Sequence, residues 1–220
     1  STLANLNFIR RCPVEALRLL DFRSRVLGNR LGGMGDVHAE SILGMMAISE
    51  GRLAEATSYF RSAIANSAAQ SPAFGKGSLW ASILYAMAAY EAGALDEVRS
   101  LLQVYVPIAR DAGIPDHVVL GYRMLCRLAF GRGDVDEAFQ ALAELESLGF
   151  QRQYQRLVAS ARLERSRLQL MQGHVAAARD ELERGSDPAV WEPLENLNLI
   201  ASELEYPQVC RLRWEICAGD

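Results

Sequence analysis

Arginine recurs at regular distances along the second half of the sequence. Three copies each stand six residues before a glycine: Arg127, Arg167 and Arg213, before Gly133, Gly173 and Gly219. In a helix, Arg123 would lie one turn before Arg127. Guanidinium groups bind carboxylates and phosphates through paired hydrogen bonds. A row of these arginines could therefore recognise an anion.

Other side chains that could do chemistry do not form a recognisable site. The histidines are far apart and lack the spacing of metal ligands: His38, His117 and His174. Cys210 and Cys217 stand seven residues apart on one predicted helix, which favours core positions over metal ligation. Residues 75–78 read GKGS, but no predicted strand precedes them and no Ser or Thr directly follows the lysine. We interpret them as an inter-repeat loop rather than a phosphate loop, and expect no enzymatic activity, metal or cofactor in this chain.

A glycine-centred segment recurs about every 40 residues. Its glycines are Gly51, Gly93, Gly133, Gly173 and Gly219, which lie 42, 40, 40 and 46 residues apart. The first three copies read EGRLAEA, AGALDEV and RGDVDEA. Glycine ends helices in the left-handed conformation, and acidic residues favour helix N-termini. Each copy therefore predicts a helix A, a tight turn at the glycine and a helix B.

Residues at fixed distances from the glycine predict how the two helices pack. Seven residues before it stand Gly44, Ala86, Cys126, Ser166 and Leu212, of which the first four are small. Five and nine residues after it, helix B has a small or β-branched residue and then a large apolar one: Ala56 and Phe60, Val98 and Leu102, Ala138 and Leu142, Ala178 and Leu182. Residues four apart share a helical face, so we expect helices A and B to approach closely along these rows.

The pattern predicts an all-α protein, a right-handed superhelix of helix-turn-helix repeats (an α-solenoid) with a period of about 40. The expected helices cover residues 13–29, 37–50, 53–68, 77–92, 95–112, 116–131, 134–148, 151–172, 174–184 and 205–217, with one short helix around 190–203. We expect one domain over residues 1–220, with units at 37–70, 77–112, 116–148 and 151–185, and partial units at 1–30 and 205–220.

The repeat resembles the tetratricopeptide repeat (TPR), whose shorter period is roughly 34. Within residues 77–185, the stretches YEAGALDE, AFGRGDVDEA and RLVASARLER resemble the sensor array of MalT-like, LuxR-type transcriptional activators of the STAND ATPase class. In that family an ATPase module precedes the array and a helix-turn-helix domain follows it. The resemblance implies that this chain is the array excised from a larger regulator, that ATP belongs to the upstream module, and that an inducer and self-association control transcription.

TPR geometry implies a concave groove lined by the A helices. The resemblance places four arginines there, Arg123, Arg127, Arg167 and Arg213, beside an apolar wall of Trp80, Met87 and Tyr90. One interpretation is a pocket for an anionic effector or an acidic partner segment. The other is a structural groove in which Glu164 or Glu215 pairs with the arginines.

Composition and charge exclude several classes of function. The net charge is −4 and the pI about 5.5, so we expect no direct DNA binding. The sequence has no apolar run of membrane-spanning length, and its four cysteines are sparse, which favours a cytoplasmic protein. Two functions remain: a sensor domain that binds a small-molecule effector and supports self-association, or a generic TPR scaffold for protein partners, unrelated to transcription.

Overall fold

The computed structural model describes Arg18 and residues 34–70, 75–112, 115–195, 197 and 206–219. Every regular element in these ranges is helical, which confirms the all-α fold class. The helices fall into two compact units, one ending at Ala112 and one beginning after it. We describe each by itself, and the single-domain organisation stays a prediction.

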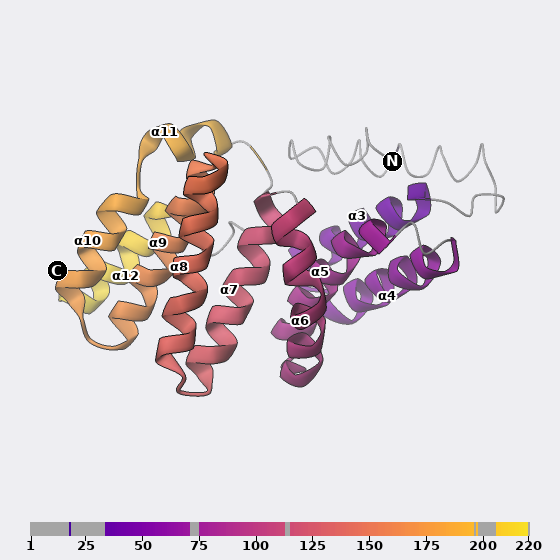
Figure 1. Ribbon diagram of the computed structural model, residues 1–220, viewed down its shortest axis with the longest axis horizontal. Helices are drawn as coiled ribbons and strands as arrows, with labels where there is room; N and C mark the ends of the chain where they lie inside the picture. The colour runs from indigo at the N-terminus through magenta and orange to yellow at the C-terminus, as the bar shows by residue number, and fades with distance from the viewer. Residues whose placement is uncertain are drawn as a thin grey trace. The chain divides into compact units, whose positions relative to one another are not determined.

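The first unit contains two helical hairpins. They are formed by α3 (Met34–Ser49) with α4 (Leu53–Gln70), and by α5 (Gly75–Glu91) with α6 (Leu95–Ala112). Each helix packs against the next in the chain, and α3 also packs against α5 (Figure 1). Large apolar side chains from all four helices are fully buried between them: Ile42, Phe60, Leu84 and Leu102.

A polar chain of contacts also joins three helices of the first unit. Arg61 of α4 donates from Nε to the Tyr85 hydroxyl oxygen at 2.8 Å, and that hydroxyl donates to Oε1 of Glu97 on α6 at 2.5 Å. Burial and the hydrogen bond to Glu97 raise the pKa of Tyr85 above its ordinary value. The phenol therefore stays protonated and keeps its donor for Glu97.

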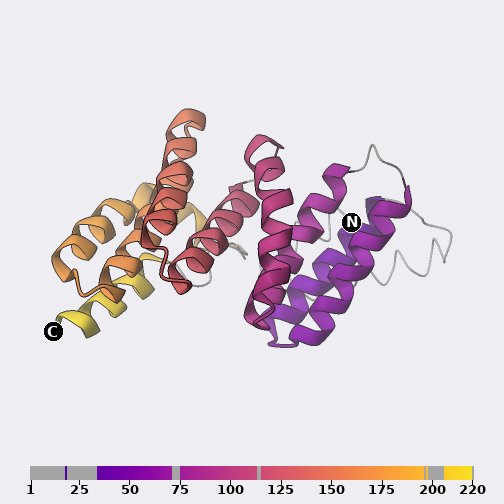
Figure 2. The same cartoon turned by 60° about the horizontal axis from the view of Figure 1, so that its bottom comes forward.

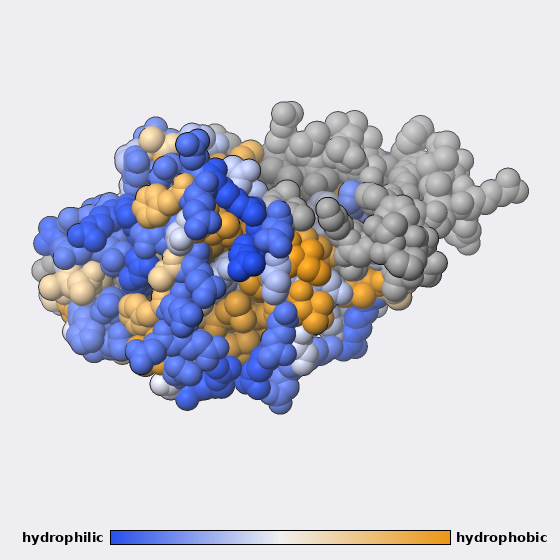
Figure 3. Space-filling model, viewed as in Figure 1, coloured by the Kyte–Doolittle hydropathy of each residue, from blue (hydrophilic) through white to orange (hydrophobic). Residues whose placement is uncertain are grey.

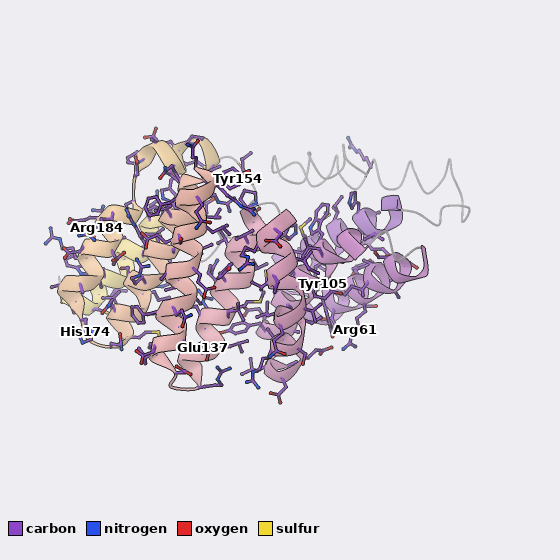
Figure 4. The ribbon with its side chains drawn as sticks, viewed as in Figure 1. Arg61, Tyr105, Glu137, Tyr154, His174 and Arg184 are labelled. Carbon is purple, nitrogen blue, oxygen red and sulfur yellow. The ribbon has the colours of Figure 1, made fainter. Side chains whose placement is uncertain are left out.

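The second unit continues the alternation of A and B helices. Its elements are α7 (Pro115–Gly131), α8 (Val135–Arg152), α9 (Gln155–Met171), α10 (Val175–Gly185), α11 (Pro188–Trp191), η3 (Glu192–Leu194) and α12 (Pro207–Ala218). Figure 2 shows the same hairpins from a second side. The glycine turns of this unit lie at one end, near Glu137 and His174, and the α8–α9 connection lies at the other end, near Tyr154 (Figure 4).

The predicted glycine turns are confirmed. Gly51, Gly93, Gly133, Gly173 and Gly219 all have φ between 75° and 84°, a region that side-chain-bearing residues rarely adopt. At the α7–α8 turn, Gly133 donates its N–H to the Phe130 carbonyl at 2.9 Å and Asp134 donates to the Ala129 carbonyl at 3.0 Å. This pair of hydrogen bonds is the Schellman motif. It ends α3, α5, α7 and α9, so that the chain can reverse.

The small-residue row is also confirmed as the line of closest approach between helices A and B. A Cβ added to Gly44 would lie 2.5 Å from the Phe60 ring, so only glycine fits there. Three repeats later, the Ser166 hydroxyl donates to the Ala178 carbonyl at 2.7 Å. In the α7–α8 hairpin, Cys126 and Ala129 pack with Ala138 and Leu142 in one buried cluster.

The boundary between α8 and α9 differs from the predicted one. The prediction ended a helix at residue 148, before Gly149, and began the next at 151, whereas α8 runs to Arg152 and α9 begins at Gln155. Gly149 lies inside α8. A Cβ at this position would lie 2.9 Å from the Val158 backbone nitrogen of α9, so the close contact between the two helices explains why the residue is glycine. The turn residue is instead Gln153, with φ of 58°.

Three further expectations have different outcomes. Residues 75–78, interpreted as a loop, form the first turn of α5. The short helix expected around 190–203 begins earlier, as α11 and η3, and its second half lies outside the described residues. The helix expected over 13–29 lies outside them too, apart from Arg18.

The register makes a first prediction about stability. Ala138→Leu adds three carbons where α7 and α8 touch, and overpacking of a buried site costs roughly 1–3 kcal/mol. Ala143→Leu is the matched control because Ala143 is an exposed residue of the same helix. We expect thermal melting to show a clear loss for Ala138→Leu and little change for the control. Equal melting temperatures for the two variants would contradict the register.

Candidate functional site

Three of the four predicted site arginines converge on one carboxylate in the second unit. Arg127 of α7 donates from Nε to Oε1 of Glu164 at 2.8 Å and from Nη2 to Oε2 at 3.0 Å. Arg167, one turn along α9, donates from Nη1 to Oε1 of the same residue at 2.9 Å. Arg123 Nε lies 3.8 Å from Oε2. We call Arg123, Arg127, Glu164 and Arg167 the arginine cluster.

Helix packing brings these residues together. Arg123 and Arg127 share a face of α7, as Glu164 and Arg167 share a face of α9, and the two A helices pack against each other. Glu164 stands nine residues before its glycine, a row that is buried and apolar in the other described A helices: Ile42, Leu84, Met124 and Cys210. A buried carboxylate is stable only when paired and hydrogen-bonded, and the guanidiniums supply that pairing.

Burial divides the arginines into two kinds. Arg123 is buried and Arg127 nearly so, whereas Arg167 keeps 28% of its side chain exposed. Arg123 and Arg127, which are largely removed from solvent, therefore have a structural task beside Glu164. Arg167 holds Glu164 with one edge and still reaches solvent, so it is the member of the cluster that an external anion could contact.

The remaining predicted residues are not part of this cluster. Arg213 is half-buried on α12. Trp80, Met87 and Tyr90 are half-buried residues of α5 in the first unit. The Trp80 ring contacts the His38 ring in a tilted arrangement, with 4.8 Å between ring centroids. Glu164 therefore contacts three of the four predicted arginines, and both the ligand role and the purely structural role of the set stay predictions.

A second ion-pair network was not anticipated from the sequence. Glu146 of α8 accepts hydrogen bonds from Arg162 and Arg165 of α9, both at 2.8 Å, and Arg165 also binds Glu181 of α10 at 3.1 Å. Burial raises the pKa of Glu146, but the hydrogen bonds from the two arginines outweigh it and lower that pKa below its usual value. The network ties three successive helices together. In the sequence, this network is indicated by the two arginines on one face of α9, Arg162 and Arg165. The glutamates that they bind lie in other helices.

The burial of His117 predicts that the stability of the chain depends on pH. Burial disfavours the imidazolium and lowers the pKa of His117 to about 4, whereas an unfolded histidine titrates near 6.5. Between these values the unfolded chain binds more protons, so the free energy of unfolding falls as pH drops below about 6.5. We expect a loss of about 2 kcal/mol from pH 7.5 to pH 5 from this residue.

Urea denaturation of a histidine-free variant checks this prediction. His117→Leu introduces the residue that stands at the equivalent place in α9, Leu157, and it cannot be protonated. The variant should lose clearly less stability than the original chain between pH 7.5 and pH 5. The same loss in both proteins would show that His117 does not carry the effect.

The structure also locates the cysteines. Cys210 is buried, as expected, but Cys217 is exposed, so its predicted core position is wrong. Cys217 lies two turns beyond Cys210, in the last turn of α12, and it is not part of the buried cluster that contains Cys210. In the described part of the chain, no group of three or more His, Cys, Asp or Glu residues could hold a metal ion, and no helix is long and apolar enough to cross a membrane.

Comparison with known proteins identifies a family but no individual relative. Residues 35–214 match the family described as the MalT-like TPR region. No curated protein and no solved structure matched the sequence. The matched range runs from the first described A helix, α3, into the last, α12, so the family likeness and the helical repeat cover the same part of the chain.

Proposed function

The chain belongs to the MalT-like TPR region family, and from that premise we propose that it is the effector-sensing and self-association domain of a MalT-like, LuxR-type transcriptional regulator. ATP and DNA would be bound by other modules of such a regulator. Fold and family set this expectation, but a site must carry the function. The observation that carries it is the convergence of arginines from α7 and α9 on one buried carboxylate.

The proposed effector is a small anion that carries a carboxylate or phosphate group. Arginine is suited to both groups because its planar guanidinium offers paired donors. Arg167 is the contact residue in this proposal, since its partly exposed side chain already orients one donor on Glu164. Arg123 and Arg127 hold Glu164 in place and keep the local potential positive.

The mechanism is a shift between two arrangements of the repeat. An anion beside Arg167 would compete with Glu164 for its guanidinium. It would so change the pairing of Glu164, the residue of α9 that Arg127 of α7 contacts. A ligand shifts such an equilibrium only by its difference in affinity for the two states. The arrangement that the anion favours would be the one that self-associates.

Ligand-dependent thermal stability tests the proposal. The 220-residue chain would be melted with inorganic phosphate, with succinate as a dicarboxylate, and with glucose as a neutral control. A ligand at a hundredfold excess over its Kd stabilises by about 2.7 kcal/mol, so one of the anions should raise the melting temperature and glucose should not. If neither anion stabilises the chain beyond a matched chloride concentration, the anion proposal is wrong and the scaffold interpretation is favoured.

A further inference from the structure

The contact between α9 and α12 repeats the contact between α7 and α9 with one change. Both are pairs of successive A helices that pack directly against each other. In the first pair, Arg123 is ten residues before its glycine and reaches Glu164, which is nine residues before the next glycine. In the second pair the same two places hold Leu163 and Cys210, which lie in one buried cluster. The second contact therefore keeps the register of the first, but it has a thiol where the first has a carboxylate.

Arg167 has the place in the second pair that Arg127 has in the first. Arg127 binds Glu164 across the α7–α9 contact through Nε and Nη2. Arg167 is likewise six residues before its glycine, but the residue of α12 that is equivalent to Glu164 is Cys210. Arg167 donates instead to Glu164 of its own helix, at 2.9 Å. Arg127 thus binds a carboxylate of the following A helix, whereas Arg167 binds none there among the residues that the structure describes.

Apolar residues surround Cys210, while Arg167 is partly open to solvent. Cys210, Leu163 and Trp191 have exposed fractions of 4% or less, and the Trp191 and Tyr206 rings meet edge to face at 6.1 Å between centroids. Arg167 keeps 28% of its side chain exposed, so a solute can reach its guanidinium. Small-molecule sites combine an apolar lining with a few polar groups in this way.

Surface character alone does not locate a ligand on the second unit. Hydrophilic residues cover most of the side that Figure 3 shows, with smaller apolar areas between them. The repeat register is more specific, because equivalent positions of a solenoid lie on equivalent faces. It brings the place of Cys210 within reach of Arg167, as Glu164 is within reach of Arg127.

We propose that a small organic acid binds at the α9–α12 contact, with its carboxylate beside Arg167 in the place that corresponds to the Glu164 carboxylate of the α7–α9 contact. This inference rests on the proposed function and narrows its effector from a carboxylate or phosphate to a carboxylate. A planar carboxylate matches one guanidinium through two parallel hydrogen bonds, as Glu164 does with Arg127. The hydrocarbon part of the acid lies against the apolar side chains around Cys210.

Calorimetric titration of the unaltered 220-residue chain tests the ligand class, with succinate and inorganic phosphate as the probes. We expect succinate to bind severalfold more tightly than phosphate. Equal or tighter binding of phosphate would overturn this inference and leave the proposed anion function standing. Absence of binding by both anions would overturn both.

Cys210→Glu tests the place. The substitution supplies a carboxylate from the chain itself, so it should weaken succinate binding at least tenfold, the loss expected for a hydrogen bond to a charged group. Cys210→Ala is the control, because it leaves the place open and should keep the affinity of the original chain. Circular dichroism checks that both variants are folded. Unchanged succinate affinity in a folded Cys210→Glu variant would overturn the assigned place, although an anion would still be sensed elsewhere.

A double-mutant comparison tests the place even if the larger side chain disturbs packing. Cys210→Glu and Cys210→Gln introduce side chains of nearly the same size, so their melting temperatures differ mainly through charge. At pH 7.5, Cys210→Glu should melt at the higher temperature, and this advantage should disappear when each is combined with Arg167→Gln. A difference that does not depend on Arg167 would show that the guanidinium does not reach this place, and would overturn the proposal.

Discussion

Replacing Glu164 by glutamine should destabilise the chain by roughly 3–5 kcal/mol, the cost of removing one partner from a buried ion pair. Arg123 and Arg127 would remain desolvated beside an uncharged amide. A Glu164→Gln side chain has nearly the same volume, so the loss would come from charge rather than packing. Urea denaturation at pH 7.5 measures it.

The matched control is another glutamate–arginine pair in the same unit. Glu183 accepts a hydrogen bond from Arg179 at 2.8 Å, but both side chains are about 60% exposed. Exposed pairs one turn apart contribute about 0.3–0.5 kcal/mol, so Glu183→Gln should change stability very little. If the two variants lost similar amounts, Glu164 would not be the buried anchor of the arginines.

Replacing Leu142 by alanine should cost about 2–5 kcal/mol, because it removes buried methyl groups and leaves a cavity. Leu142 is fully buried between α7 and α8 with Cys126, Ala138 and Leu168. The prediction tests the row nine residues after the glycine, whose equivalent members Phe60, Leu102 and Leu182 are also buried.

Leu95→Ala provides the comparison, because Leu95 also lies in a B helix but is 45% exposed. We expect it to cost well under half as much as Leu142→Ala. Chemical denaturation measures both losses. The two free energies of unfolding are directly comparable if both variants show the same slope of free energy against denaturant concentration. A larger loss for Leu95→Ala would mean that the face of helix B is assigned wrongly.

Helix ends were predictable where a glycine marks them. At Gly133 the turn requires positive φ, and glycine adopts it without strain, so the residue type predicts the conformation. The α8–α9 connection uses Gln153 in the same conformation, and this side chain carries no such signal. Gly149 lies inside α8, where its small size allows close contact with α9 and does not mark a turn.

The arginine row was predictable for the same reason, since repeats place equivalent residues on equivalent faces. The arginines pair with Glu164, which is the charged residue of an otherwise apolar row. The number of arginines that contact Glu164 depends on how α7 packs on α9, which the sequence does not show. The Glu146 network involves α8, α9 and α10. Its distances depend on helix rotations that the repeat pattern does not specify.

Isothermal titration of the 220-residue chain with succinate and with phosphate tests the central claim, that an anion is sensed beside Arg167. For the anion that binds, Arg167→Gln should weaken the affinity at least tenfold, because a hydrogen bond to a charged group contributes about 1.5–3 kcal/mol. Arg132→Gln, at an exposed arginine of the α7–α8 turn, should leave it unchanged. Absence of binding heat for both anions, or equal affinity in both variants, would contradict the account.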